Sequence, residues 1–161
     1  MSVTPLQSDI VSLEGYFNGL VNQDPELHSF VLETSNSPFE MERFNEVAKT
    51  NQFSYPALAM LMPVITGDDN EMHNFEAKQE VGFCILYAND KSHDGRMAAF
   101  KKAQLAAWRI LRGIRRDSKQ RIFRLEKLYY KLAPFEYGSD GAVGYYAVVT
   151  MITSTNSLIG S

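Results

Sequence analysis

The sequence has 161 residues, of which 45% are hydrophobic and 22% are charged, and its formal net charge is −3. These values are typical of one globular domain whose core is large enough to fold alone, so we expect a single domain over residues 1–161. The negative charge excludes general attraction to nucleic acid, and contact with DNA would need a local basic patch. Because Cys84 is the only cysteine, an intrachain disulfide framework and a cysteine-rich zinc site are excluded as well.

No apolar run reaches the roughly 18 residues that a membrane-spanning helix needs. The N-terminal stretch MSVTPLQSDI has neither a basic segment nor a continuous apolar one, so no secretion signal is expected. Cys84 lies in the apolar run VGFCIL, where we expect it to be a small buried hydrophobic side chain. Together these features predict a soluble, non-secreted protein.

An amphipathic helix is predicted over residues 5–22. Thr4 followed by Pro5 is a helix-start signal, because threonine can cap free amides and proline at the first position has no donor to lose. The apolar residues that recur at steps of three and four, and so share one face, are Leu6, Ile10, Leu13, Phe17 and Leu20. The pair Asp24-Pro25 is expected to end this helix.

Alternation in LHSFVLET, residues 27–34, predicts the first strand. Ser37-Pro38 repeats the start signal and predicts a short second helix that ends near Thr50. The nearly continuous apolar run FSYPALAMLMPVI, residues 53–65, predicts one strand buried on both faces. The first 65 residues are thus expected to alternate between helix and strand.

Residues 65–79 are polar and acidic with a single glycine, so we expect a long connection or an extended hairpin tip there. The run EVGFCILYAND follows as the third strand. A long helix from Ser92 or Asp94 to about Ser118 comes next. The chain then has two β-rich runs, joined by the hairpin loop EYGSDG: IFRLEKLYYKLAPF and GAVGYYAVVTMITST.

The expected element order is therefore α, β, α, β, β, α, β, β. This order predicts an α+β fold, in which a mostly antiparallel, mixed sheet is covered by the N-terminal helix and by a long basic amphipathic helix. A short flexible C-terminal tail is expected from about residue 154.

The segment AAFKKAQLAAWRILRGIRRDSKQR gathers positive charges around a tryptophan in an acidic chain. On a helical wheel that starts at Lys101, the expected core face lies between roughly 180 and 280 degrees and holds Phe100, Ala103, Ala107, Ile110, Leu111 and Ile114. The opposite arc, called here the basic stripe, holds Lys101, Lys102, Arg109, Arg112, Arg115, Arg116 and Lys119. Asp117 is the only acidic residue between Lys101 and Lys119, so we expect the partners of the stripe to be water or another surface.

Three interpretations fit the basic stripe. Large apolar side chains amid arginine are typical of a protein interface. A solvated surface, with the tryptophan tucked under a neighbouring loop, fits as well. A nucleic-acid contact is the third, although the interleaved aromatic residues of single-strand binders are absent from the sequence. The interface candidates on this helix are Leu105, Trp108, Arg109, Arg112, Arg115 and Arg116.

The acidic segment 67–76 could meet the basic stripe of a neighbouring subunit in a head-to-tail contact that closes into a ring, or it could remain solvated. The interface candidates in this segment are Asp68, Asp69 and Glu71. The segment also offers possible metal ligands: Asp68, Asp69, His73 and Glu76. An acid-base group could be built from Asp90, His93 and Asp94. Neither set has the spacing of a known site, and the sequence has no catalytic or cofactor motif, so we expect a non-enzymatic protein without cofactor or metal.

With this element order, the chain resembles the tail terminator or tail-completion proteins of long-tailed bacteriophages and prophages. The likeness lies in the capped amphipathic first helix, the strand FSYPALAMLMP after a short helix, the long helix before the final hairpin, and the closing strand YGSDGAVGYYAVVTMITS. The resemblance implies a small α+β subunit that forms a hexameric ring on the end of the tail tube, stops its polymerisation and contacts the head-completion proteins.

It also implies assembly in the bacterial cytoplasm, a final place in the virion tail, and no membrane contact. Trp108 and the arginines of the long helix would then serve subunit contacts, or line a lumen through which DNA passes without sequence recognition. Two alternatives remain open. One is a small-ligand- or metal-binding enzyme or module that uses the loops 67–76 and 90–94. The other is a stand-alone adaptor that binds an acidic partner through the basic helix.

Overall fold

The computed structural model describes residues 6, 9–69, 75–89, 92–120, 123–125, 131–137 and 141–154. Over these ranges the helices are α1 (Ile10–Gln23), α2 (Glu42–Ala48) and α3 (His93–Lys119). The strands are β1 (Ser29–Leu32), β2 (Ala57–Met60), β3 (Val64–Asp69), β4 (Phe75–Tyr87), β5 (Arg124–Leu125), β6 (Lys131–Tyr137) and β7 (Ala142–Ser154). The α+β fold class expected from the sequence is confirmed. None of these helices is long and apolar enough to cross a bilayer.

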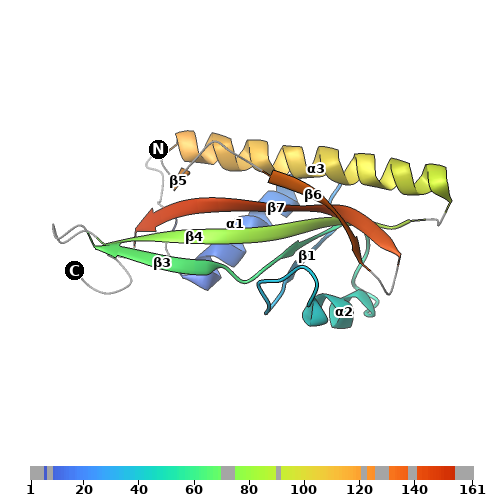
Figure 1. Ribbon diagram of the computed structural model, residues 1–161, viewed down its shortest axis with the longest axis horizontal. Helices are drawn as coiled ribbons and strands as arrows, with labels where there is room; N and C mark the ends of the chain where they lie inside the picture. Colours follow the sequence, from blue (N-terminus) through green and yellow to red (C-terminus); the bar gives the residue numbers. More distant parts are fainter. Residues whose placement is uncertain are drawn as a thin grey trace.

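All the described strands belong to one mixed sheet (Figure 1). Its order is β1-β2-β4-β7-β5, with β3 also beside β4 and β6 also beside β7. The pair β1 and β2 is parallel, and the other described pairs are antiparallel. Strands β4 and β7, each 13 residues long, pair with each other from Glu76↔Ser154 to Tyr87↔Val143. This long pair is the spine on which the shorter strands and the helices are arranged.

The pleat of β4 divides the core between the two faces of the sheet, because successive side chains point to opposite sides. Val81, Phe83 and Ile85 belong to the larger apolar cluster, which they share with α1 and α3. Cys84 and Leu86 belong to a second cluster, which they share with α2. Thus α1 and α3 cover one face and α2 covers part of the other. Cys84 is buried as expected, and burial raises the pKa of its thiol.

The run at residues 53–65, predicted as a single strand, forms two strands instead. Met60 pairs with Phe83 while Val64 pairs with Glu80, so three residues between β2 and β3 lie opposite two residues of β4. This is a bulge, and it contains Pro63, which has no N–H to donate to a ladder. The residues of β2 are fully buried, but those at the start of β3 are about half exposed, so only the middle of the run, residues 57–61, is buried.

The long connection or hairpin expected at residues 65–79 is a hairpin, since β3 pairs with β4 up to Asp69↔Phe75. The hairpin expected at EYGSDG is also confirmed, because β6 pairs with β7 up to Tyr137↔Ala142. The β-rich run before it divides into β5 and β6, which pair with different parts of β7. The tail expected after residue 154 lies outside the described residues.

The helix α1 begins at Ile10 rather than near Pro5, which lies outside the described residues together with Thr4. The carboxylate of Asp9 accepts a hydrogen bond from the backbone N–H of Ser12 at 2.8 Å and caps the helix. Aspartate is among the strongest N-cap residues. The cap therefore overrides the earlier start signal.

The helix α2 begins at Glu42 rather than at Pro38, because residues 37–40 form a turn in which Glu40 N–H donates to the carbonyl of Ser37. The free amides of α2 are capped from a distance. The fully buried carboxylate of Glu33, just after β1, accepts the backbone N–H groups of Arg43 at 3.1 Å and Phe44 at 2.8 Å. A charge-assisted bond to a helix N-terminus offsets the burial of this carboxylate.

The helix α3 agrees with its prediction, since Ser92 caps it by accepting the N–H of Gly95 at 3.0 Å. The predicted core residues are buried except for Phe100, which is partly buried. The buried arc is wider than predicted, however, and also includes Ala106, Gly113 and Asp117. The cause is α1, which packs along this side of α3. A Cβ at Gly113 would lie 3.2 Å from Cδ2 of Leu20.

Truncation of the core at α3 should destabilise the protein. We expect Ile114→Ala, at a fully buried position, to lower the free energy of unfolding by about 2–5 kcal/mol, because it removes apolar contacts and leaves a cavity. Gln104→Ala, at an exposed position of the same helix, is the control and should change it by less than about 0.5 kcal/mol. Urea unfolding followed by circular dichroism measures both, and equal values would show that the helix has a different phase.

Candidate functional site

The outer surface of α3 carries the residues that the sequence singled out. Leu105 and Trp108 are each 49% exposed, as expected for side chains that face away from the core. They lie one turn apart and border a hollow of about 540 Å³. The described lining of this α3 hollow consists of Leu105, Trp108, Arg109, Leu111, Arg112 and Arg115. In the described lining, apolar and cationic side chains of α3 are thus next to one another.

The cations around the hollow are not equivalent. Arg112 and Arg115 are exposed, and within the described part of the chain no ion pair involves either of them. The same holds for Lys101, Lys102 and Lys119, which lie farther along the stripe. Two guanidinium groups beside exposed apolar side chains are therefore available to an external acidic group.

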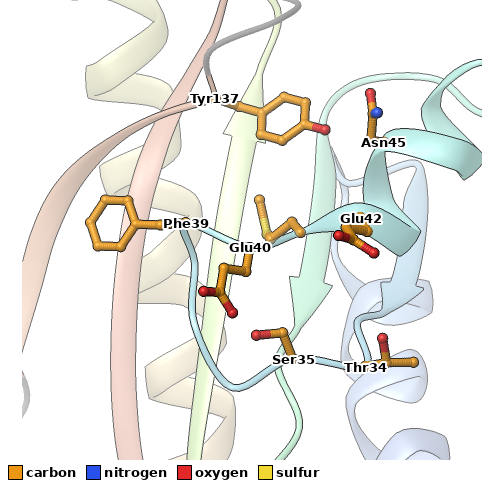
Figure 2. Close-up of a pocket in the computed structure, with 8 residues that line it drawn as sticks. Thr34, Ser35, Phe39, Glu40, Glu42, Asn45 and Tyr137 are labelled. Atoms are coloured by element: carbon orange, nitrogen blue, oxygen red, sulfur yellow. The ribbon is translucent and has the colours of Figure 1, made fainter.

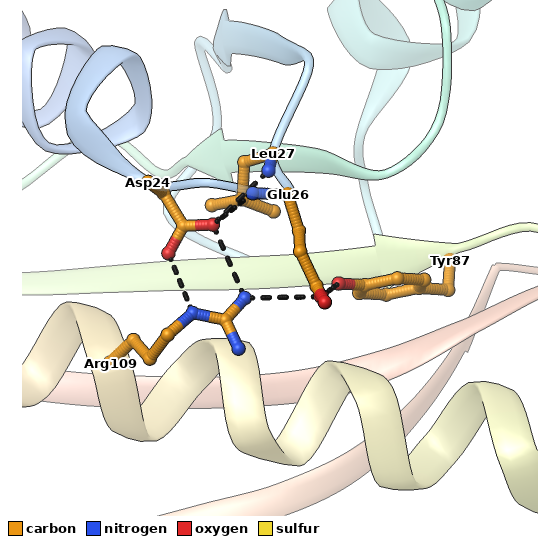
Figure 3. Close-up of polar contacts among 5 residues, drawn as sticks. All are labelled: Asp24, Glu26, Leu27, Tyr87 and Arg109. Carbon is orange, nitrogen blue, oxygen red and sulfur yellow. Dashed lines mark hydrogen bonds and ion pairs between the residues drawn. The ribbon is translucent and has the colours of Figure 1, made fainter.

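Arg109 corrects the sequence interpretation, because its partners are in the same molecule rather than in water or on another surface. Its Nε lies 2.9 Å from Oδ2 of Asp24, and its Nη2 lies 3.2 Å from Oδ1 of the same carboxylate (Figure 3). The same Nη2 also lies 3.3 Å from Oε2 of Glu26. Both acidic residues belong to the segment between α1 and β1, so Arg109 ties α3 to that segment and contributes only the rim of the hollow.

The environment of Asp24 explains why this pair is strong. Its side chain is 3% exposed and lies at the C-terminal end of α1, where the helix dipole disfavours a negative charge. Burial works against the ionised form, but the hydrogen bond from Arg109 and those from the backbone N–H groups of Glu26 and Leu27 outweigh it. The pKa of Asp24 therefore lies below its usual value. The same bidentate contact raises the pKa of Arg109.

Tyr87 extends the network to the end of β4. Its hydroxyl donates to Oε2 of Glu26 at 2.7 Å, as Figure 3 shows. Burial, together with this bond to a carboxylate, raises the pKa of Tyr87 to about 12. The hydroxyl therefore stays protonated at neutral pH and acts as a donor. The network joins α1, β4 and α3 and is a structural clamp.

Arg116 also departs from the expected solvated stripe. Its Nε lies 3.2 Å from Oδ1 of Asp117, the one acidic residue between Lys101 and Lys119, whereas water or another surface was expected to be the partner of the stripe. The other carboxylate oxygen of Asp117 accepts the hydroxyl of Tyr16 in α1 at 2.7 Å. The next residue in the chain thus binds Arg116 on the side of α3 that faces α1. Of the four arginines in the basic stripe, only Arg112 and Arg115 therefore make no ion pair within the described part of the chain.

Only part of the acidic segment 67–76, which the sequence suggested as the partner of the basic stripe, lies within the described residues. Asp68 and Asp69 lie in β3, at the end that enters the hairpin tip, and nothing is described of their side chains. Glu71, like His73 and Asp90, lies outside the described residues. Of the proposed acid-base group, His93 and Asp94 are exposed in the first turn of α3. Among the residues whose side chains are described, no group of three or more possible metal ligands occurs.

A second exposed surface was not found from the sequence. The loop of residues 37–41 before α2 exposes Phe39 to 86%, more than any other large apolar side chain in the described ranges. It borders a polar hollow of about 550 Å³ between this loop and Tyr137 (Figure 2). Glu40 and Glu42 on its rim are exposed. A helical wheel of the predicted second helix carries a signal for this surface, since it puts Phe39 on the side opposite Met41 and Phe44.

Removing the guanidinium of the clamp should cost stability. We expect Arg109→Met to lower the free energy of unfolding by about 3 kcal/mol, because it leaves the buried carboxylate of Asp24 without its cation while keeping an apolar stem. Arg112→Met, on the same helix and exposed, is the matched control and should change it by less than about 0.5 kcal/mol. Urea unfolding at neutral pH measures both, and equal stability of the two variants would contradict the clamp.

The clamp should also depend on pH. The pKa of Asp24 is lower in the folded protein than the value of about 3.9 in an unfolded chain. Its ionised form therefore contributes stability above about pH 4, and this contribution is lost as the pH falls through the lower, folded-state pKa. We expect the stability difference between the wild-type protein and Asp24→Asn to be largest at neutral pH and to shrink below about pH 4. A difference that grows on acidification would have the opposite sign and contradict the assignment.

Comparison with known proteins assigns this chain to no family. No protein-family model matches it, and no curated protein sequence does. The resemblance to tail terminators therefore stays a prediction from the order and pattern of the elements.

Proposed function

We propose that the protein is a non-enzymatic assembly protein whose copies associate through the outer surface of α3. In line with the resemblance to phage tail terminators, the assembly would be a ring that caps a tail tube and joins it to head-completion proteins. The observation that supports this proposal is the α3 hollow, which the half-exposed side chains of Leu105 and Trp108 line together with Arg112 and Arg115. Tryptophan and arginine are the residues that most often dominate the energy of protein interfaces.

The surroundings of the hollow favour a protein partner over solvent. Half of Trp108 is in contact with water in the isolated chain, and burying that area is favourable at about 25 cal/mol per Å². The helix below it is held by the core and by the Arg109 clamp, so little ordering is needed when a partner binds. The rim cations add selectivity for a partner that presents carboxylates.

The charge distribution favours protein over nucleic acid as the principal contact. The chain carries a formal net charge of −3, and two arginines of the stripe are engaged within the molecule. A protein that follows a phosphate backbone needs a continuous basic track. The remaining cations surround an apolar centre, which is the anatomy of a subunit contact.

The first test is the solution mass over a range of protein and salt concentrations, measured by light scattering. We expect a multimer that dissociates on dilution and at high salt, because exposed charges are screened. A species of monomer mass at every concentration and salt would contradict the proposal.

The second test changes the rim of the hollow. Arg112→Glu with Arg115→Glu should leave the fold intact, because both side chains are exposed, and should weaken assembly by at least about tenfold. Lys101→Glu with Lys102→Glu makes the same change of charge on the same helix, outside the lining of the hollow, and should preserve assembly. Assembly of the arginine variant at wild-type strength would remove α3 as the interface.

A further inference from the structure

The described part of the chain exposes, on another surface, a group whose chemistry suits the α3 hollow. Phe39 is 86% exposed, and Glu40 and Glu42, which follow it in the chain, are exposed as well. The α3 hollow has the opposite charge, since Arg112 and Arg115 line it together with apolar side chains. An exposed aromatic side chain with two carboxylates nearby is complementary in polarity and in charge to an apolar hollow whose lining includes two guanidinium groups.

We propose that Phe39 of one copy inserts into the α3 hollow of a second copy, with Glu40 and Glu42 opposite Arg112 and Arg115. This inference rests on the proposed function and deepens it, because it names the surface that fills the hollow. The occupant is thus a second copy of this chain, and the complement differs from the acidic segment 67–76 that the sequence suggested.

The loop around Phe39 is ordered for this role. The N–H of Phe39 donates to Oγ of Ser37 at 3.2 Å, and its ring lies 6.1 Å from the ring of the buried Phe135. Met41 is buried, and Glu33 fixes the start of α2 just beyond. Figure 2 shows the ring of Phe39 directed away from Glu42 and Tyr137, so it projects from the loop rather than folding back into the polar hollow. A side chain held in this way loses little conformational freedom on binding.

The positions of the two surfaces determine the type of assembly. The α3 hollow lies on the helix layer of the larger core cluster, whereas Phe39 contacts Phe135 in the cluster on the other face of the sheet. In Figure 1, α3 lies above the sheet and α2 lies below it. One neighbour therefore covers the hollow of a given copy, and a different neighbour receives the Phe39 of that copy. Each copy has two neighbours, which is the heterologous contact that produces rings or filaments rather than two-fold dimers.

Two charge-reversed proteins test this contact. One carries Glu40→Lys and Glu42→Lys, and the other carries Arg112→Glu and Arg115→Glu. Each should remain monomeric alone, because like charges would then meet at every contact, with a dissociation constant at least about 30-fold weaker than wild type. An equimolar mixture should assemble, because the two kinds of contact between unlike copies pair opposite charges. The mixed assembly should contain the two proteins in alternation, at a ratio of one to one by native mass spectrometry.

The aromatic group has its own test and control. Phe39→Ser should weaken assembly by about 30-fold, as expected for an anchor at the centre of an interface. Val11→Ser removes another exposed apolar side chain, on α1, and should leave assembly unchanged. Circular dichroism spectra that match the wild-type spectrum would show that each variant is folded.

The outcomes separate this inference from the proposed function. Restored one-to-one assembly in the mixture supports both. Loss of assembly in the arginine variant alone, with wild-type assembly of the Phe39 and glutamate variants, overturns this inference and leaves α3 as an interface with another partner surface. Wild-type assembly of every variant, or a wild-type protein that is always monomeric, overturns both.

Discussion

The antiparallel pairing of β4 with β7 is the constraint on which the rest of the structure depends. At Gly144 the two strands approach too closely for a side chain, since a Cβ there would overlap the carbonyl oxygen of Ile85. Their alternating side chains give the sheet two apolar faces, one covered by α1 and α3 and the other by α2. The same alternation puts the α3 hollow and Phe39 on opposite sides of the molecule. If the two surfaces bind each other as proposed, this placement requires that each copy contact two different neighbours.

Most of α3 could be predicted from the sequence because its information is local. The 3.6-residue period gave the buried positions Ala103, Ala107 and Ile114, and Ser92 marked the start. The same period put Leu105 and Trp108 on the outer surface, where each is half exposed. What the period could not show is the neighbour of the helix. Packing of α1 widens the buried arc, so Arg109 and Arg116, at the edge of the predicted stripe, find acidic partners within the molecule.

The errors in the sequence analysis share a physical cause, which is that a distant residue or a cap decided the outcome. The start of α2 depends on Glu33. Its carboxylate accepts a hydrogen bond from the backbone N–H of Arg43, which is 10 residues farther along the chain. The partner of Arg109 is 85 residues away in the chain, and no local pattern announces it. The split of the apolar run at residues 53–65 depends on its register against β4. Phe39 was overlooked because the Ser37-Pro38 signal assigned it to a helix rather than to an exposed loop.

Trp108 offers the most direct measurement of the central claim, that the α3 hollow is a contact between copies. It is the only tryptophan in the sequence and is 49% exposed in the isolated chain, so its fluorescence reports on the hollow alone. We predict that its emission moves to shorter wavelength as protein concentration rises through the assembly transition, and that quenching by acrylamide falls in parallel. The variant with Arg112→Glu and Arg115→Glu should show neither change. A rise in mass with unchanged emission and quenching would place the contact elsewhere and contradict the account.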